Sequence, residues 1–123
     1  MKLFILLGSL NALIAVALGA FGAHGLEGKI SERMLEVWKT GVTYQMFHAL
    51  GLLIIGMLIG KFPEASAFTW AGWAMFVGII LFSGSLYALS TTGIKVFGPI
   101  TPLGGLAFLI AWVFVMVGAV KYL

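Results

Sequence analysis

Cysteine is absent from the 123-residue chain, and its absence removes several kinds of chemistry. Disulfide bonds, thiolate metal sites and a cysteine nucleophile are all excluded. Charge is also scarce, because charged residues make up only 9% of the sequence, against about a quarter of an ordinary soluble domain. The net charge of +3 suits contact with anionic lipid headgroups and is too small to indicate a nucleic-acid partner.

The long apolar stretches of the chain contain no Asp, Glu, Lys or Arg. A nucleophile pair made of Ser83 or Ser85 with His48 would therefore have no acid beside it to orient the imidazole. Ion-coupled transporters usually keep carboxylates or broken helices near the membrane midplane, and neither is evident in this sequence. A metal site needs more ligands than His24, His48 and Glu27. We therefore expect no catalytic residue, no metal ion and no cofactor.

Hydrophobic residues dominate what is present, at 62% of the chain with a mean hydropathy of +1.14. They form apolar windows of about 18–22 residues, and crossing a bilayer takes about 20 residues of helix. Because backbone groups in lipid must be hydrogen-bonded internally, these windows are expected to be helices. The sequence thus predicts an all-α membrane protein, one domain over residues 1–123 with four transmembrane helices in an antiparallel bundle. The expected spans are 3–22, 43–60, 68–89 and 103–120.

The first window begins like a secretory signal peptide, but its apolar run continues to Gly22, so we expect it to remain as a span. Between the first two spans, apolar and charged residues alternate with helical spacing after Ser31, a good N-cap residue. This pattern predicts a short amphipathic interfacial helix at about 31–40, with Trp38 as its anchor. The alternative is a plain extension of the second span. For the fourth span, the sequence predicts a start with Thr101 as N-cap and Pro102 at the first helical position.

Short connections place sequential helices antiparallel, so both termini share one side with the 61–67 turn. We call this the terminal side, and the side that holds the 23–42 and 91–102 connections the loop side. Lys and Arg number four on the loop side and three on the terminal side, which weakly favours a cytoplasmic loop side. Small residues four positions apart, as at Gly56 and Gly60, favour close helix packing. That packing would lie inside one bundle or between copies in a homo-oligomer.

A polar side chain inside lipid needs a partner, so the few polar residues of the spans are the candidates for a site. Most of them are predicted to lie in the loop-side half of the membrane, and only Asn11 is predicted near the midplane. We expect one hydrogen-bonded cluster around His48 that opens toward the loop side. The alternatives are plain structural hydrogen bonding between helices, which is common in membranes, and a conduction path. The predicted cluster comprises His24, Tyr44, Gln45, His48, Ser83, Ser85 and Tyr87.

Four segments in order along the chain carry a resemblance to a known family. They are GAFGAHGL at 19–26, TYQMFHALGL at 43–52, LFSGSLY at 81–87 and ITPLGGLAF at 100–108. Together they resemble the YgdD/YwdK-like family of small bacterial membrane proteins of unknown function. The resemblance implies four membrane helices and a multi-pass protein of the bacterial plasma membrane, and it implies no catalytic or ligand-binding residue.

The expected function is that of a non-enzymatic integral membrane protein. It would bind a lipid-like or small ligand, or a protein partner, at the polar cluster around His48. The alternative is a subunit of an oligomeric channel or small-solute transporter. The expected partners are membrane lipids and, in a homo-oligomer, further copies of the chain, without nucleic acid.

Overall fold

The computed structural model describes all residues 1–123, and they fold into four long helical rods. The first rod joins α1 (Lys2–Phe21) to a π-helical turn, η1 (Gly22–Leu26), and the second is α2 (Glu32–Lys61). The third rod runs through α3 (Ser66–Gly78), the π-helical turn η2 (Ile79–Ser83) and α4 (Gly84–Thr92), and the fourth is α5 (Phe97–Tyr122). All four are long and apolar enough to cross a membrane, which confirms the expected all-α membrane fold.

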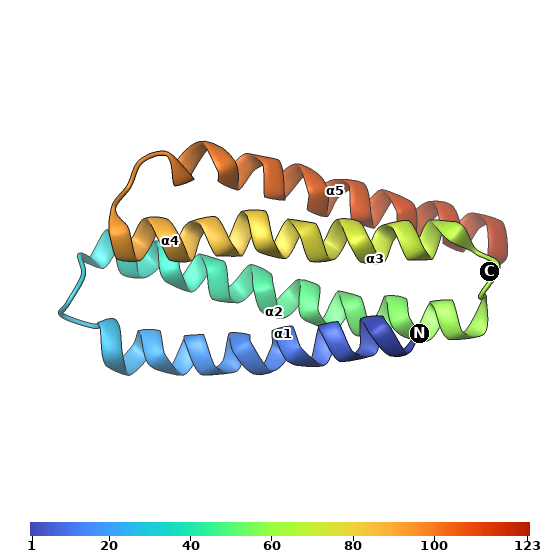
Figure 1. The fold of residues 1–123 in the computed structure, drawn as a ribbon, viewed down its shortest axis with the longest axis horizontal. Coiled ribbons are helices and arrows are strands. Elements are labelled where there is room, and N and C mark those ends of the chain that lie inside the picture. The colour runs from blue at the N-terminus through green and yellow to red at the C-terminus, as the bar shows by residue number, and fades with distance from the viewer.

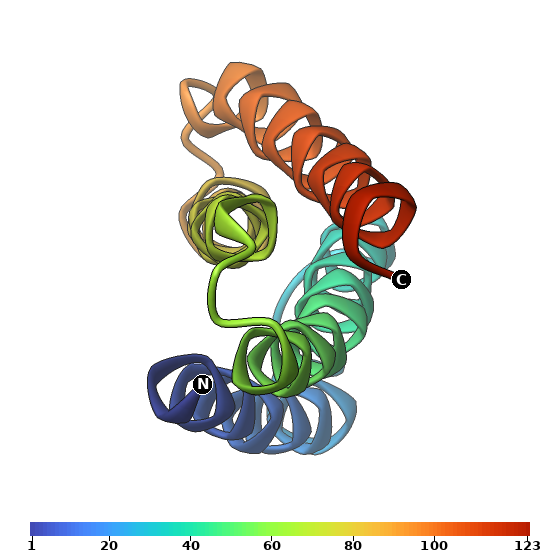
Figure 2. The ribbon, with the colours of Figure 1, turned by 90° about the vertical axis from the view of Figure 1, so that its right-hand side faces the viewer.

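The rods lie side by side with alternating directions, and the two chain termini lie at the same end (Figure 1). Extensive contacts join α1 to α2, α2 to the third rod, and the third rod to α5. The end view shows these neighbours in a curved arrangement, with α1 and α5 at opposite ends (Figure 2). The central hydrophobic core comprises Phe4, Leu52, Ile55, Ala71, Met75, Ile79, Phe108 and Ala111.

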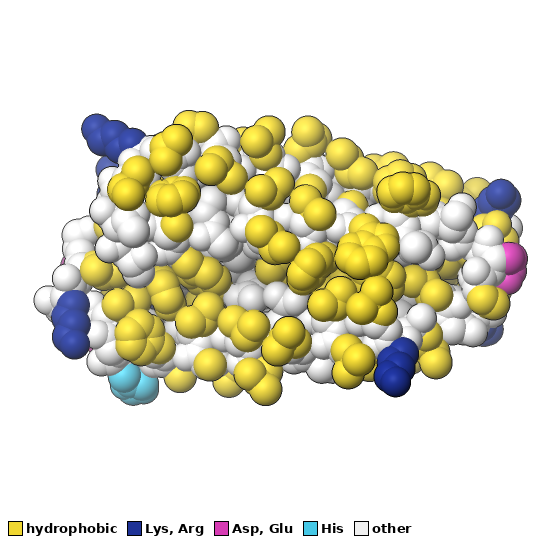
Figure 3. Space-filling view, viewed as in Figure 1, with side chains coloured by type: hydrophobic (Ala, Val, Ile, Leu, Met, Phe, Trp, Pro, Cys, Tyr) yellow, Lys and Arg dark blue, Asp and Glu magenta, His cyan; other side chains and the backbone are white.

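The face of the molecule shown in Figure 3 is mostly covered by hydrophobic side chains, and the Lys and Arg side chains in view lie mainly toward its ends. Leu13 and Leu109, in the charge-free segments of α1 and α5, are each 66% exposed. In water such a surface would aggregate, whereas in a bilayer it meets acyl chains. The outer surface therefore agrees with the span assignment.

The interfacial helix expected at about 31–40 is not a separate element, and that prediction was wrong. Ser31 does cap a helix, because its hydroxyl accepts the Met34 N–H at 3.1 Å. That helix is α2 itself, which runs without a break to Lys61. Trp38 is only 5% exposed, and its indole N–H donates to the Leu18 carbonyl of α1 at 2.9 Å. No proline interrupts residues 40–43, so the amphipathic segment continues directly into the span.

The start of the fourth span also differs from the prediction. Helix α5 begins at Phe97, so Pro102 lies inside it and Thr101 is not its N-cap. Pro102 removes one backbone hydrogen bond of this helix. Pro99, in the first turn, removes none, because the first N–H groups of a helix have no acceptor within it. Gly93, with φ of +71°, ends α4 in the left-handed conformation that glycine adopts easily.

Candidate functional site

His48 lies in the interior and bridges two helices. Its side chain is 6% exposed, and its Nε2 accepts the indole N–H of Trp112 on α5 at 3.1 Å. Because an indole nitrogen can only donate, Nε2 must be unprotonated. The Nδ1 therefore carries the proton and donates it to the Tyr44 carbonyl one turn earlier, at 2.8 Å. His48 is thus a neutral ring with both nitrogens engaged inside the protein.

Two aromatic rings, Phe108 and Tyr44, lie in planes nearly parallel to the His48 imidazole, whereas Trp112 is tilted by 57°. The imidazole stacks on Phe108 with centroids 3.6 Å apart and planes 10° apart. The Tyr44 ring lies 9° from the imidazole plane at a centroid distance of 6.3 Å. Phe82, from η2, packs on Tyr44 at 4.4 Å. The result is a block of aromatic rings contributed by α2, η2 and α5.

This block forms one wall of a groove of about 630 Å³ between α2, η2 and α5. Tyr44 is 42% exposed and Trp112 is 39% exposed, so both offer free surface to the groove. The Tyr44 side chain contacts its neighbours through its ring, and its hydroxyl has no partner inside the protein. The groove is lined by Tyr44, His48, Phe82, Pro102, Gly105, Leu106, Phe108, Leu109 and Trp112.

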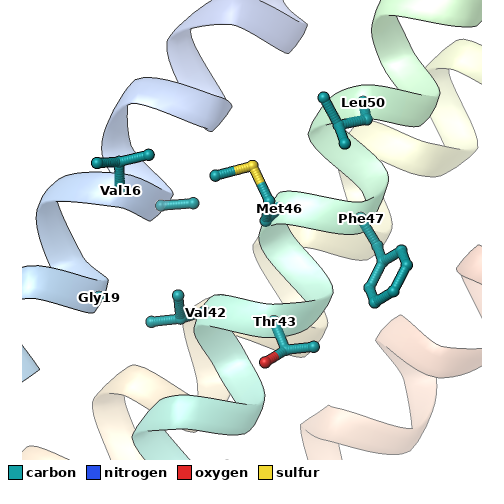
Figure 4. A pocket seen from close by; sticks show the side chains of 8 residues that line it. Val16, Gly19, Val42, Thr43, Met46, Phe47 and Leu50 are labelled. Atoms are coloured by element: carbon teal, nitrogen blue, oxygen red, sulfur yellow. The ribbon is translucent and has the colours of Figure 1, made fainter.

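A second groove of about 540 Å³ lies between α1 and α2, and it is chemically plainer. Figure 4 shows Val16 and Gly19 on α1 opposite Val42 and Met46 on α2. Its polar side chain, Thr43, already donates its hydroxyl to the Lys39 carbonyl at 3.0 Å. This α1–α2 groove presents an aliphatic surface with no free polar group, which suits an acyl chain without selecting one lipid from another.

Asn11, Gln45 and Tyr87 form a separate hydrogen-bonded chain across three helices. The Gln45 amide donates to Asn11 Oδ1 at 3.0 Å, and the Tyr87 hydroxyl donates to Gln45 Oε1 at 2.7 Å. Asn11 also donates to the Leu7 carbonyl at 2.8 Å. Gln45 and Asn11 are 4% and 6% exposed. The arrangement ties α1, α2 and α4 together, as structural hydrogen bonds do in membranes.

The two serines form further separate contacts. Ser83 is fully buried and donates to the Gly41 carbonyl of α2 at 2.7 Å. The Ser85 hydroxyl lies 2.6 Å from that of Thr101 on α5. His24 is exposed in η1, outside these networks. The expectation of one cluster was therefore wrong, since the residues form several separate groups on α2, η2 and α4, and His24 belongs to none.

The depth expected for His48 changes with the helix boundary. Because α2 is continuous, its charge-free part runs from Thr40 to Gly60. His48 then lies about 14 Å along the helix from Lys39 and about 20 Å from Lys61. This is close to the middle of the membrane, deeper than a span beginning at residue 43 implies. At such depth a histidine needs partners from its own protein, and Tyr44 and Trp112 provide them.

Sequence reasoning missed the partners of the predicted residues, chiefly Trp112, Phe108 and Thr101. The sequence could have indicated Trp112, which lies in a charge-free span nine residues before Lys121. An indole N–H at that depth requires an acceptor inside the protein. Phe108 had none, since phenylalanines are common throughout the spans. No three His, Asp or Glu side chains converge on a common point.

Four helical rods with long charge-free segments, buried polar side chains bonded inside the bundle and grooves open at its sides define a multi-pass, all-α integral membrane protein. Residues 18–105 match the family described as protein of unknown function (DUF423), and the chain belongs to that family. This confirms the resemblance drawn from the four sequence segments.

Individual relatives match along their whole length. The UPF0382 membrane protein YwdK of Bacillus subtilis is 61% identical over all of both chains. A UPF0382 membrane protein of Staphylococcus aureus is 56% identical over 99% of this chain and 98% of its own. A Staphylococcus epidermidis relative is 50% identical over the same shares. No solved structure matches the chain.

Proposed function

We propose that the protein is a non-enzymatic membrane protein that binds a lipid-like ligand in the groove between α2, η2 and α5. The observation that carries the proposal is a groove of about 630 Å³ lined by aromatic and aliphatic side chains, one of them Tyr44, whose hydroxyl has no partner inside the protein. Ligand sites are typically concave, mostly apolar and about 300–1,000 Å³, with a few polar groups that orient the ligand. The α1–α2 groove has the volume but lacks the free polar group.

His48 supports this proposal as a wall of the site and not as a reactive group. Both of its nitrogens are already bonded, to Tyr44 and Trp112. A general base must reach the proton that it abstracts, and this ring has no free nitrogen to offer. Its contribution is to hold Trp112 and Phe108 in place beside the groove.

The proposal is tested by gentle extraction of the full-length protein followed by native mass spectrometry. We expect the wild type to carry a bound molecule of lipid-like mass. Gly105→Phe should lose it, because a Cβ at Gly105 meets only the Phe82 ring, at 3.9 Å, and a larger side chain would then occupy the groove. Val16→Phe fills the α1–α2 groove instead and should retain the ligand. A wild type free of bound molecules, or identical adducts in wild type and Gly105→Phe, would contradict the proposal.

The alternative is a subunit of an oligomeric channel or transporter. It would need polar groups that face a water-filled axis between copies, whereas Asn11 and His48 are each 6% exposed and bonded within one chain. Solute flux through reconstituted protein, together with a symmetric oligomer, would favour this alternative.

We also propose that the membrane is the bacterial plasma membrane. The support is the kinship with proteins of Bacillus and Staphylococcus that are named membrane proteins. Fractionation of cells that carry a tagged copy should place the tag with plasma-membrane markers, and its recovery elsewhere would contradict the assignment.

A further inference from the structure

We infer that the ligand of the groove between α2, η2 and α5 is of the quinone kind. It carries a flat, uncharged, conjugated ring with carbonyl groups, attached to a long apolar tail. This inference rests on the proposed function and specifies the ligand of the same site. Its basis is the juxtaposition of parallel aromatic rings, one free hydroxyl and the aliphatic side chains of Leu106 and Leu109 in a groove without charge.

The aromatic wall selects for a flat ring. Tyr44 and Phe108 lie with planes 19° apart, and the imidazole of His48 lies within 10° of both. The orientation is fixed, since His48 is bonded through both nitrogens. Tyr44 remains 42% exposed at the groove. Aromatic groups prefer offset-stacked or edge-on contact with one another, so a planar ligand ring can extend this block.

The absence of charge selects for an uncharged head group. None of the nine lining residues is Asp, Glu, Lys or Arg, and the one ionisable imidazole is held neutral by the indole N–H. A phosphate, carboxylate or ammonium group at this depth would have no counter-charge, which is costly in hydrocarbon. Ordinary charged phospholipid headgroups are therefore unsuitable for this position.

The Tyr44 hydroxyl selects for an acceptor on that ring. It has no partner inside the protein, and a group in lipid gains by finding one. Tyr44 lies about 8 Å along α2 from Lys39, so the hydroxyl is on the loop side of the midplane. A ring carbonyl is a strong acceptor that carries no net charge.

The remaining lining accommodates the tail. Leu106 and Leu109 face the groove along α5, between Pro102 near its loop-side end and Trp112 at mid-depth. The ten-residue step from Pro102 to Trp112 covers about 15 Å. An isoprenoid chain attached to the ring would follow this strip and leave the groove sideways into the bilayer.

The test compares two probes with the same tail. One is a methylnaphthoquinone that carries a geranylgeranyl chain, and the other is geranylgeraniol, which has the chain and a hydroxyl but no ring. Binding of each to the purified full-length protein in lipid nanodiscs is measured by titration and native mass spectrometry. We expect the quinone to bind at least about tenfold more tightly, since stacking and one hydrogen bond each contribute a few-fold.

Variants at Tyr44 separate the two contributions. Tyr44→Phe keeps the ring and should weaken quinone binding about three- to tenfold. Tyr44→Leu removes the ring as well, so the quinone and geranylgeraniol should bind with about equal affinity, and geranylgeraniol should still bind. Retained binding of the alcohol shows that the variant keeps its groove. Val16→Phe, in the other groove, should behave as the wild type.

Three outcomes overturn the inference. Equal affinities for quinone and alcohol would show that the groove binds the lipid chain and does not recognise the ring. The quinone inference would then fail and the proposed function would stand. If neither probe binds but the protein co-purifies with another ligand at this groove, the quinone inference fails and the proposed function again stands. Binding of neither probe by protein that is free of any ligand would overturn both proposals.

Discussion

At the scale of single residues, the structure shows how a membrane protein accommodates polar side chains without water. No buried polar side-chain atom lacks a partner inside the protein. The buried polar residues are Asn11, Gln45, His48, Ser83, Ser85 and Ser90. Several of these partners are backbone carbonyls or indole N–H groups, not further polar side chains. The bonds that join two helices, such as Ser83 to Gly41 and Trp112 to His48, act as ties between neighbours.

Gln45 lies in the middle of the hydrogen-bonded chain that joins α1, α2 and α4, with Asn11 at one end. Its replacement should therefore lower the free energy of unfolding more than replacement of Asn11. Gln45→Leu keeps the volume but leaves both Asn11 Oδ1 and the Tyr87 hydroxyl without their partner, and should lower the free energy of unfolding by about 2 kcal/mol. Asn11→Leu leaves one Gln45 N–H unpaired and should lower it by about 1 kcal/mol. Unfolding in bilayers by steric trapping measures both. A larger effect for Asn11→Leu would contradict this ranking.

At the scale of elements, the π-helical turn η2 decides how the third rod meets its neighbours. The Gly84 N–H bonds to the Ile79 carbonyl, five residues back, so the turn holds an extra residue and shifts the faces that follow. After it, Ser85 meets α5 and Tyr87 meets α2. On the α5 side, Gly104 lies so close to η2 that a Cβ there would overlap the backbone of Leu81 and Phe82. Phe82 and Gly105, which lie beside this contact, line the groove.

Two adjacent glycines give a matched test of this contact. Gly104→Ala would push α5 away from η2, because a backbone cannot yield as a flexible side chain does, and should lower the free energy of unfolding by about 3 kcal/mol. Gly105→Ala places its Cβ at ordinary contact distance, 3.9 Å from the Phe82 ring, and should leave stability nearly unchanged. Steric trapping of both variants measures the difference. Equal stabilities would show that α5 does not approach η2 this closely.

At the scale of the whole molecule, the helices pack mainly with their neighbours in sequence, in a curved arrangement that keeps α1 and α5 apart (Figure 2). The grooves open at the sides of the bundle, toward the acyl chains, and not at its ends. A ligand would thus enter from the bilayer. This route suits molecules that already partition into lipid.

The absence of cysteine makes the topology directly testable. Single cysteines at Lys29, Lys95 and Glu64, all exposed, are labelled in intact cells with a membrane-impermeant maleimide. We expect positions 29 and 95 to behave alike and position 64 to behave oppositely, because they lie at the two ends of an antiparallel bundle. The weak excess of positive charge predicts that position 64 is the one labelled from outside. Opposite behaviour of positions 29 and 95 would contradict the fold.

The sequence by itself determined the class of protein and the number of spans. Four runs of this length without charge are typical of membrane spans, and a helix satisfies the backbone groups of each run within that run. It also indicated that His48 and Gln45 needed partners, because a polar group in hydrocarbon is costly wherever it lies. The cap at Ser31 could be read from local chemistry alone.

Only the tertiary structure decided which partner each polar group finds and where the groove lies. In a soluble protein, the alternation of polar and apolar residues marks the inward face of a helix. In a bilayer the outside is as apolar as the core, so this signal is lost and the rotation of each rod cannot be read from the sequence. The pairing of His48 with Trp112, and not with Ser83 or Ser85, depends on that rotation and on the shift at η2.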